Sequence, residues 1–306
     1  MKILICTIVR NAEITIPRWW SKVKHITEHY PEIEFGISVY ENDSEDNSKT
    51  LLEECMKEAP NYFSEHRLKT EDIQTNFYQS VVDGDRVNNL AKARNECFNQ
   101  VRDLSFYDYA MSVEVDCQLS VESLKLLFHN IHEWDILSAT SYAPPTDYMI
   151  EIARTQGVKF KVPFYDHWAT RLTSDEDMWD NKITEEKPLF QTSLSSLNPQ
   201  DLVSEIDEIL PLYSTFNLVC LYRMKAIIEG CRFSGYSDYL QSFDCDTTVI
   251  CEQFHQAGYN RIGLIPHLKV FNDPYLQITS SAVNHKSVSY THLRAHETRG
   301  NLVCRL

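Results

Sequence analysis

The stretch FGISVYENDSEDNSKTLLEECMKEA, residues 35–59, joins an apolar run to a run of helical periodicity through a cluster of oxygen-bearing side chains. Residues 35–40 predict a strand, because a short continuous apolar run is typical of a strand buried on both faces. Residues 47–59 predict a helix, since their apolar side chains recur at helical spacing. The polar residues between them have two interpretations. They cap the helix and form the turn, or they contact a nucleotide.

Strand and helix patterns continue to alternate on both sides of this stretch. This order predicts one α/β domain with a mainly parallel sheet and helices on both faces. The long irregular region over residues 143–212 predicts elaborated loops. The remaining predicted elements are strands at 2–9, 107–115 and 134–140, helices at 16–30, 86–104, 121–131 and 244–256, a strand–helix unit at 216–230 and a strand pair at 261–271.

Composition excludes several classes of protein. A formal charge of −15 over 306 residues argues against a general nucleic-acid binder, which needs a basic surface. Nine cysteines without a CxxC pair indicate buried thiols in a reducing compartment rather than a zinc site. No apolar run approaches the roughly 18 residues of a membrane span. We therefore expect a cytoplasmic protein with no integral membrane segment.

The end of the chain differs in character from the rest. VSYTHLRAHET at 288–298 and LVCRL at 302–306 resemble a translated sequencing adaptor. We therefore expect a functional domain over 1–275, a tail over 276–287 and a non-native tail over 288–306. His292 and His296 in that tail are excluded as metal ligands.

Polar side chains follow three of the predicted strands. The carboxyl ends of parallel strands lie at one edge of the sheet, where ligands bind. Glu114 and Asp116 are separated by one residue, so on a strand their side chains point to the same face. Both could therefore approach one divalent cation. The alternative is an ordinary acidic strand end. The polar residues at these ends are Arg10, Asn11, Glu41, Asn42, Asp43, Glu114 and Asp116.

Further candidates each have a structural alternative. Asp244 and Asp246 at a helix start could act in a cleft, or cap the helix. In YDHWATR, residues 165–171, Asp166, His167 and Arg171 could contact sugar or phosphate and Trp168 could stack on a sugar, or plug the core. The remaining candidates are Arg86 and Arg94, which could face a phosphate or solvate a helix, and His267, which could be a third metal ligand or structural.

Several common nucleotide and hydrolase motifs are missing from the sequence. There is no GxxxxGK[ST], no GxGxxG after a strand, no GxSxG and no HExxH. These absences argue against a P-loop NTPase, a dinucleotide-binding enzyme, an α/β-hydrolase and a zinc protease of the HExxH type.

In order and spacing, ICTIVRN, YENDSEDNS, LAKARN, EVD and DCDTTVICEQFHQAGY resemble a GT-A glycosyltransferase. With YDHWATR and FNLVCLYRMKAIIEG, the chain more narrowly resembles the fungal capsule-associated α-1,3-mannosyltransferase family (glycosyltransferase family 69), over roughly residues 2–275. The resemblance implies a GT-A-like (Rossmann-like) fold, Mn²⁺ or Mg²⁺, and transfer of a hexose from a nucleotide-sugar donor. GDP-mannose is the best candidate donor, a saccharide or lipid-linked molecule the acceptor, and retention the expected stereochemistry.

The resemblance also implies roles for individual residues. Glu41 would contact the base or ribose of the donor, and residues 44–48 would then cap the following helix. Asp116 would be the direct metal ligand in the position of the DxD element. Asp244 would be a base in an inverting enzyme, or would position the donor in a retaining one. The full assignment is Asp244 and Asp166 for catalysis, Arg10, Asn11, Glu41, Asn42, Arg86, Arg94 and Glu114 for the donor, Asp116, Glu114 and His267 for the metal, and Trp168, Arg171 and Asp246 for the sugar or acceptor.

The sequence departs from the family pattern at three points. The metal element is E-x-D instead of D-x-D, Leu172 stands where an acid usually follows, and fungal relatives carry a membrane anchor before the first strand. Two alternative functions remain. A sugar nucleotidyltransferase would carry a glycine-rich loop after the first strand, and VRNAEITIPRW has no glycine. A non-catalytic nucleotide-sugar or carbohydrate-binding protein is the other.

Overall fold

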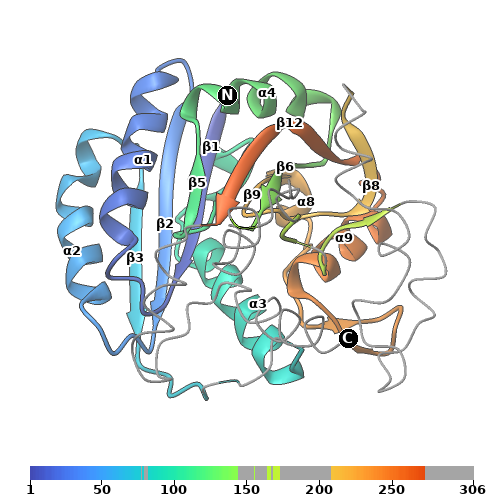
Figure 1. The fold of residues 1–306 in the computed structure, drawn as a ribbon, viewed down its shortest axis with the longest axis horizontal. Coiled ribbons are helices and arrows are strands. Elements are labelled where there is room, and N and C mark those ends of the chain that lie inside the picture. The colour runs from blue at the N-terminus through green and yellow to red at the C-terminus, as the bar shows by residue number, and fades with distance from the viewer. Residues whose placement is uncertain are drawn as a thin grey trace.

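The computed structural model in Figure 1 describes most of the predicted domain. His167 and the predicted tails lie outside the described residues. The structure describes residues 1–76, 78, 82–143, 155, 164–166, 168–172 and 208–272.

A ten-stranded sheet forms the centre of the molecule (Figure 1). Its strands follow the spatial order β3 (His66–Glu71), β2 (Glu34–Asn42), β1 (Lys2–Val9), β4 (Tyr109–Val113), β9 (Val219–Arg223), β6 (Ile136–Tyr142), β12 (Ile262–Asn272), β8 (Leu210–Ser214) and β7 (Arg171–Leu172), and β5 (Cys117–Leu119) pairs with β12 outside this path. β1 pairs in parallel with β2 and β4, β2 with β3, and β12 with β6. β9 runs antiparallel to both β4 and β6, so β4 and β6 share a direction and the sheet is mainly parallel.

Helices cover both faces of the sheet, as the alternating pattern predicts. Successive residues of a strand point to opposite faces, and in β1 Ile3 and Ile5 join one core cluster while Leu4 and Cys6 join another. The first cluster packs under α1 and the second under α3 and α9. The helical elements are α1 (Ile16–His29), α2 (Ser48–Glu58), α3 (Gly84–Asn99), α4 (Lys125–Asn130), α8 (Met224–Ile228), α9 (Asp246–Gln256) and the 3-10 turns η1 (Ala59–Asn61), η2 (Leu104–Phe106), η3 (Val121–Leu124) and η4 (Ile131–Glu133).

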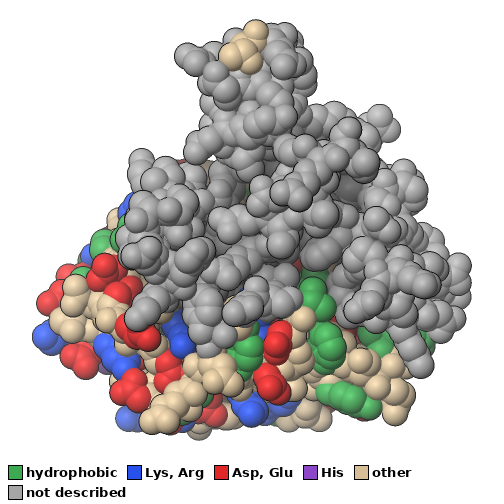
Figure 2. Space-filling model, turned by 60° about the horizontal axis from the view of Figure 1, so that its bottom comes forward, with side chains coloured by type: hydrophobic (Ala, Val, Ile, Leu, Met, Phe, Trp, Pro, Cys, Tyr) green, Lys and Arg blue, Asp and Glu red, His purple; other side chains and the backbone are tan. Residues whose placement is uncertain are grey.

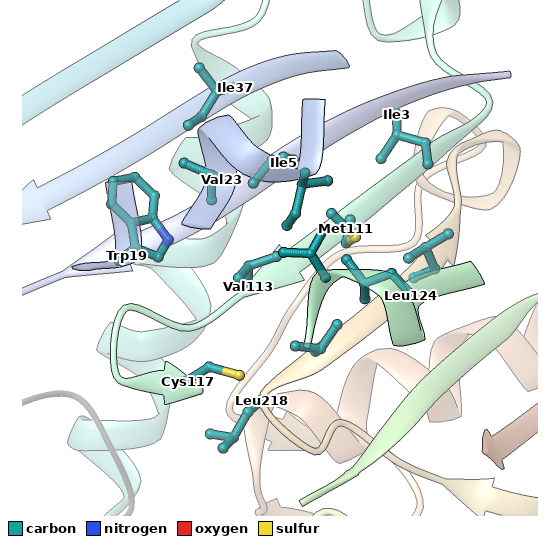
Figure 3. Packing of buried hydrophobic residues seen from close by; sticks show 14 of the residues in the cluster. Ile3, Ile5, Trp19, Val23, Ile37, Met111, Val113, Cys117, Leu124 and Leu218 are labelled. Atoms are coloured by element: carbon teal, nitrogen blue, oxygen red, sulfur yellow. The ribbon is translucent and has the colours of Figure 1, made fainter. Parts of the chain in front are cut away.

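The core beneath α1 fixes the strands whose ends carry the candidate site. Figure 3 shows Trp19 and Val23 of α1 in one cluster with side chains of β1, β2 and β4, among them Ile5 and Met111. These side chains are almost completely buried. Burying a large apolar side chain contributes about 1.5–3 kcal/mol, so this cluster holds the neighbouring strand ends in a fixed register.

Several elements differ from the sequence-based prediction. The helix predicted over 121–131 consists of η3, α4 and η4, and the strand pair predicted over 261–271 is the single strand β12 with a register shift between Leu264 and Lys269. β3, β5, β7 and β8 were not predicted, and β7 with most of β8 falls in the region 143–212 that was expected to be irregular. β3 is a partly exposed edge strand with polar residues, and β5 has only three residues, so neither has a clear apolar pattern. A separate two-stranded sheet, β10 (Tyr236–Ser237) and β11 (Ser242–Phe243), precedes α9.

The described surface carries charges of both signs. Figure 2 shows Asp and Glu side chains interspersed with Lys and Arg on the face that is at the bottom of Figure 1. Among the described residues, none of the helices combines the length and apolar character needed to cross a bilayer. The eight cysteines in this part of the chain are buried free thiols, as expected from their positions in apolar runs.

Candidate active site

The parallel pairing places three polar strand ends at one edge of the sheet, which we call the carboxyl-end edge. Val9 at the end of β1 pairs with Glu41 of β2, and Cys6 of β1 pairs with Ser112 near the end of β4. Glu114 follows β4 directly. The prediction that these strand ends lie together is confirmed.

The acidic stretch after β2 holds the loop after β1. Ser44 Oγ accepts a hydrogen bond from Asn11 N at 2.9 Å, and Asn11 Oδ1 accepts one from Glu45 N at 2.7 Å. Asn11 has a φ of 48°, a left-handed conformation that asparagine tolerates better than most residues. Ser48 Oγ accepts from Ala12 N at 2.7 Å. The polar cluster therefore couples two loops at the carboxyl-end edge.

This arrangement corrects the helix-cap interpretation of the stretch. α2 begins at Ser48, and the side chain of its N-cap residue, Asn47, makes no capping hydrogen bond. Asp46 Oδ1 instead accepts from Ser48 N at 3.0 Å. Of the residues expected to cap the helix, one acid serves its first turn, while the serines bind the neighbouring loop.

Glu41 is a fully buried carboxylate with one free oxygen. Its Oε1 accepts a hydrogen bond from Ser44 N at 2.8 Å, whereas Oε2 has no hydrogen-bond partner. Burial raises the pKa of Glu41, although the hydrogen bonds from Ser44 oppose this shift. A buried polar atom without a partner is costly, so Oε2 is well suited to bind a ligand group that carries a donor.

Asp43, which the sequence placed at a strand end without a role, organises the adjacent loop. Its carboxylate accepts hydrogen bonds from Gln74 N at 2.8 Å and Thr75 N at 3.0 Å. Burial opposes ionisation, but these bonds and the Thr75 hydroxyl outweigh it and lower the pKa of Asp43 to about 2. Arg10 donates to Thr75 Oγ1 at 2.8 Å and Asn42 donates to Asp43 Oδ2 at 2.8 Å. The predicted donor residues Arg10 and Asn42 thus belong to one network.

Arg94 connects two parts of the chain that carry candidate catalytic acids. Its Nη1 lies 2.7 Å from Glu114 Oε1 and its Nε lies 2.8 Å from Asp246 Oδ2. All three residues are buried, and the guanidinium lies 4.5 Å from the ring centre of Phe216. Burial alone would lower the pKa of Arg94, but Glu114 and Asp246 outweigh it and raise that pKa above its usual range. The alternative that Arg94 solvates a helix face is wrong.

Asp116 lies in the turn after β4 and is 1% exposed. Its Oδ2 accepts a hydrogen bond from Asn272 Nδ2 at 2.6 Å. The amide oxygen of Asn272, Oδ1, is buried and has no hydrogen-bond partner. A carboxylate beside an unpartnered amide oxygen fits the oxygen ligands that Mn²⁺ and Mg²⁺ prefer. Sequence reasoning missed Asn272, because the predicted strand ended at residue 271.

His267 lies elsewhere on β12 and its side chain is exposed. Among the described residues, Glu114, Asp116 and His267 do not bring three ligand atoms within 4.8 Å of one another. The structure thus brings together Glu114 and Asp116 at the strand end, but it does not join His267 to them.

Asp244 is held by three donors on a single oxygen. Its Oδ1 accepts from Trp168 Nε1 at 3.0 Å, from Arg171 Nη2 at 2.8 Å and from Cys245 N at 2.7 Å. Its Oδ2 is buried and has no hydrogen-bond partner. The N-cap residue of α9 is Cys245, so Asp244 lies just before the cap. This geometry orients the carboxylate and leaves one oxygen for a ligand.

Asp166 and Arg86 are also buried. Asp166 Oδ2 accepts from Asn217 N at 2.8 Å. Burial raises the pKa of Asp166 to about 6, against the effect of the backbone N–H groups of Asn217 and Ala169. Asn217, a residue that sequence reasoning missed, has a φ of 57° and its Oδ1 accepts from Ser141 Oγ at 2.7 Å. Arg86 N donates to Asp83 Oδ1 at 3.0 Å in the first turn of α3.

The raised pKa of Asp166 predicts a dependence of stability on pH. The folded state keeps a proton up to about pH 6, whereas an unfolded aspartate loses it near 3.9. The folded state therefore binds more protons in this window, and its stability falls as the pH rises through it. We expect wild type to lose about 3 kcal/mol relative to Asp166→Asn between pH 4 and 7, as measured by urea unfolding. Parallel curves for the two proteins would contradict this assignment.

Comparisons with known proteins identify the family and the fold of this chain. A family model described as Cryptococcal mannosyltransferase 1 matches residues 2–253. The chain belongs to this family. The match to Cryptococcal mannosyltransferase 1 includes Glu41, Glu114, Asp116 and Asp244 and ends before Asn272. The predicted resemblance to a family of fungal mannosyltransferases is confirmed. A search of curated proteins finds no significant match.

Solved structures similar to this member of the Cryptococcal mannosyltransferase 1 family are glycosyltransferases. GalNAc-T7, solved with UDP, GalNAc and Mn²⁺, is 11% identical with a TM-score of 0.51, over 89% of this chain and 44% of that one. TarS residues 1–349 from S. aureus are 15% identical with a TM-score of 0.46, over 90% and 61%. A mannosyltransferase from Pyrobaculum calidifontis, PcManGT, solved with GDP-Man and Mn²⁺, is 10% identical with a TM-score of 0.49, over 89% and 56%.

The likeness to GalNAc-T7 confirms the expected GT-A-like fold. The chain spans less than two thirds of each of these three proteins. The family match supports a glycosyltransferase.

Proposed function

We propose that this protein transfers a hexose, with mannose as the best candidate, from a nucleoside diphosphate sugar to a hydroxyl of a saccharide or lipid-linked acceptor. The observation that supports this most directly is the buried Arg94 bridge. It joins Glu114, two residues before Asp116, to Asp246, two residues after Asp244. The bridge therefore ties the candidate metal ligand and the candidate cleft acid to the same part of the carboxyl-end edge.

The chemistry of the donor side follows from Asp116 and Asn272. These two residues would hold a divalent ion. When bound, the ion would neutralise negative charge on the leaving diphosphate. Glu114 accepts a hydrogen bond from Arg94. We therefore propose that Glu114 supports the position of Asp116 and is not itself a principal metal ligand. Asp116 lies in a tight turn, where Cys117 N donates to Glu114 O at 3.1 Å. This turn fixes the direction of the carboxylate.

The cleft acid acts at the sugar. With Oδ1 of Asp244 occupied by three donors, Oδ2 is the oxygen that can face the reacting sugar. In a retaining enzyme, it would position the donor and stabilise positive charge on the sugar ring. In an inverting enzyme, it would accept the proton of the acceptor hydroxyl. Trp168 and Arg171 act through Asp244, since both donate to the same oxygen.

The function can be tested with purified protein, Mn²⁺ or Mg²⁺ and a panel of GDP-, UDP- and other sugar nucleotides. A ligand that binds the folded state raises the melting temperature, so we expect GDP-mannose to give the largest rise. We also expect the protein to hydrolyse GDP-mannose slowly in the absence of acceptor. Equal shifts for all donors would contradict the choice of GDP-mannose. Binding without hydrolysis or transfer to any acceptor would favour a non-catalytic sugar-binding protein.

Glu41 gives a separate prediction about donor binding. In Glu41→Gln the side chain can still accept the hydrogen bond from Ser44 N, but its second group becomes a donor. A hydrogen-bond donor on the ribose or base of the nucleotide would then lose its acceptor. We expect the KM for the nucleotide sugar to rise about 10-fold with little change in kcat. Steady-state kinetics will test this. Glu45→Gln, an exposed neighbour in the same loop, is the matched control, and an equal effect in both variants would contradict a specific contact of Glu41.

A further inference from the structure

A second group of metal-ligating side chains lies away from the carboxyl-end edge. His25 and His29 occur four residues apart on α1, so they project from the same side of the helix. Glu122 of η3 faces them, and the three residues offer one ligand atom each, all within 4.8 Å of one another. Among the described residues this is the one group of three histidine, cysteine or acidic side chains with such spacing.

The location separates this group from the proposed active site. α1 connects the carboxyl end of β1 to the amino end of β2, so its last turn lies at the amino end of these strands. Glu122 follows β5, which leads the chain away from Asp116 because it runs antiparallel to β12. The group therefore lies at the opposite end of the sheet from Asp116.

The backbone around the three ligands is fixed by other contacts. Tyr30, directly after α1, donates from its hydroxyl to Val121 O at 2.9 Å and to Glu122 O at 3.2 Å. Lys22 of α1 donates to Cys117 O of β5. Apolar residues of α1 and η3 also share one core cluster. The distance between the helix and Glu122 is thus set independently of any ion.

The ligands themselves are ready to bind. All three side chains are exposed, and the histidine rings lie edge to face with centroids 5.9 Å apart. Glu122 Oε2 accepts a hydrogen bond from Ser120 Oγ at 2.6 Å. Ligand atoms around a tetrahedral zinc ion lie about 3.3 Å apart. Rotation of exposed side chains can close the observed spacing without movement of the backbone.

We propose that His25, His29 and Glu122 form a surface site for Zn²⁺ that clamps the end of α1 to η3. Two imidazoles and one carboxylate suit Zn²⁺, whereas Mn²⁺ and Mg²⁺ prefer oxygen ligands. Solvent completes the coordination, because the group is open on its outer side. An ion held here stabilises the folded chain by mass action and takes no part in sugar transfer.

The test uses the full chain, without an affinity tag and treated with a chelator. Titration calorimetry with Zn²⁺ should show a site that His25→Ala and His29→Ala each weaken at least 10-fold, with a smaller loss for Glu122→Gln. The rise in melting temperature with Zn²⁺ should disappear in the double variant His25→Ala/His29→Ala. His132→Ala, at another exposed histidine, is the control and should bind as wild type does. His292 and His296 are present in every variant, so their contribution cancels.

The test of the zinc site does not depend on the proposed sugar-transfer activity. Asp116→Asn should retain the zinc-dependent rise in melting temperature, and His25→Ala/His29→Ala should retain sugar transfer with Mn²⁺. Equal Zn²⁺ affinity and stoichiometry in wild type and in the double histidine variant would overturn the site. A response to Mn²⁺ as strong as to Zn²⁺ in the Asp116→Asn background would overturn the assigned metal class.

Discussion

Asp116→Asn is expected to lower sugar transfer by at least about 1,000-fold while leaving the fold intact. The change removes the negative charge that would attract a divalent ion, and metal-assisted departure of a diphosphate depends on that charge. The asparagine oxygen can still accept the hydrogen bond that Asn272 Nδ2 now gives to Asp116 Oδ2 at 2.6 Å. We therefore expect the melting temperature in the absence of metal to stay within a few degrees of wild type. Initial rates over a series of Mn²⁺ concentrations will measure the loss.

Two controls make this result specific. Asp108→Asn makes the same change of charge beside the same strand but at its other end, because Asp108 lies directly before β4, where its carboxylate accepts from Lys2 N at 2.8 Å. That variant should keep normal transfer. Asn272→Leu removes the amide oxygen and should raise the Mn²⁺ concentration needed for half-maximal rate. Full turnover by Asp116→Asn would show that Asp116 is not the ligand.

The edge that carries the site could be predicted from the sequence for a physical reason. Parallel strands separated by helices must all end on one side of the sheet, so polar residues such as Glu41 and Asp116 at strand ends had to converge. The order of the β-α-β units fixed this without knowledge of any contact. The predicted placement depends on topology alone, which short apolar runs reveal well.

Contacts between distant segments could not be predicted in this way. Asn272 meets Asp116 across 156 positions of the chain, and Asn217 meets Asp166 across 51. Neither asparagine stands in a motif, and each is placed by tertiary pairing. The loop after β2 shows the same limit, since its serines have good local partners in the helix but bind Asn11 and Ala12 instead.

The sequence around Arg94 contains a signal that its side chain is buried. In α3 it falls in step with the apolar residues Leu90 and Phe98, both of which are buried. An arginine on the apolar side of a helix must be paired when buried. The pattern therefore indicated a buried ion pair, and the partners Glu114 and Asp246 were themselves candidates from separate motifs. What the sequence could not specify was that one guanidinium would serve both.

Arg94→Met should destabilise the protein by about 3–5 kcal/mol, because removal of one partner leaves two buried carboxylates without their countercharge. Methionine fills a similar space against Phe216 and Phe233, over whose rings the guanidinium lies at 4.5 and 5.7 Å, so lost packing contributes little. Urea unfolding near neutral pH will measure the change. Arg94→Lys should show an intermediate loss, since a single ammonium group cannot reproduce the two directed bonds to Glu114 and Asp246.

The control is a pair of the same chemistry at the surface. Arg261 and Glu133 approach to 3.4 Å, but their side chains are 60% and 78% exposed, so Arg261→Met should cost no more than about 1 kcal/mol. At temperatures where Arg94→Met remains folded, we expect kcat to fall more than the donor affinity, because the bridge aligns the segments that carry Asp116 and Asp244. An Arg94→Met protein with wild-type stability and wild-type kcat would show that the bridge aligns neither acid.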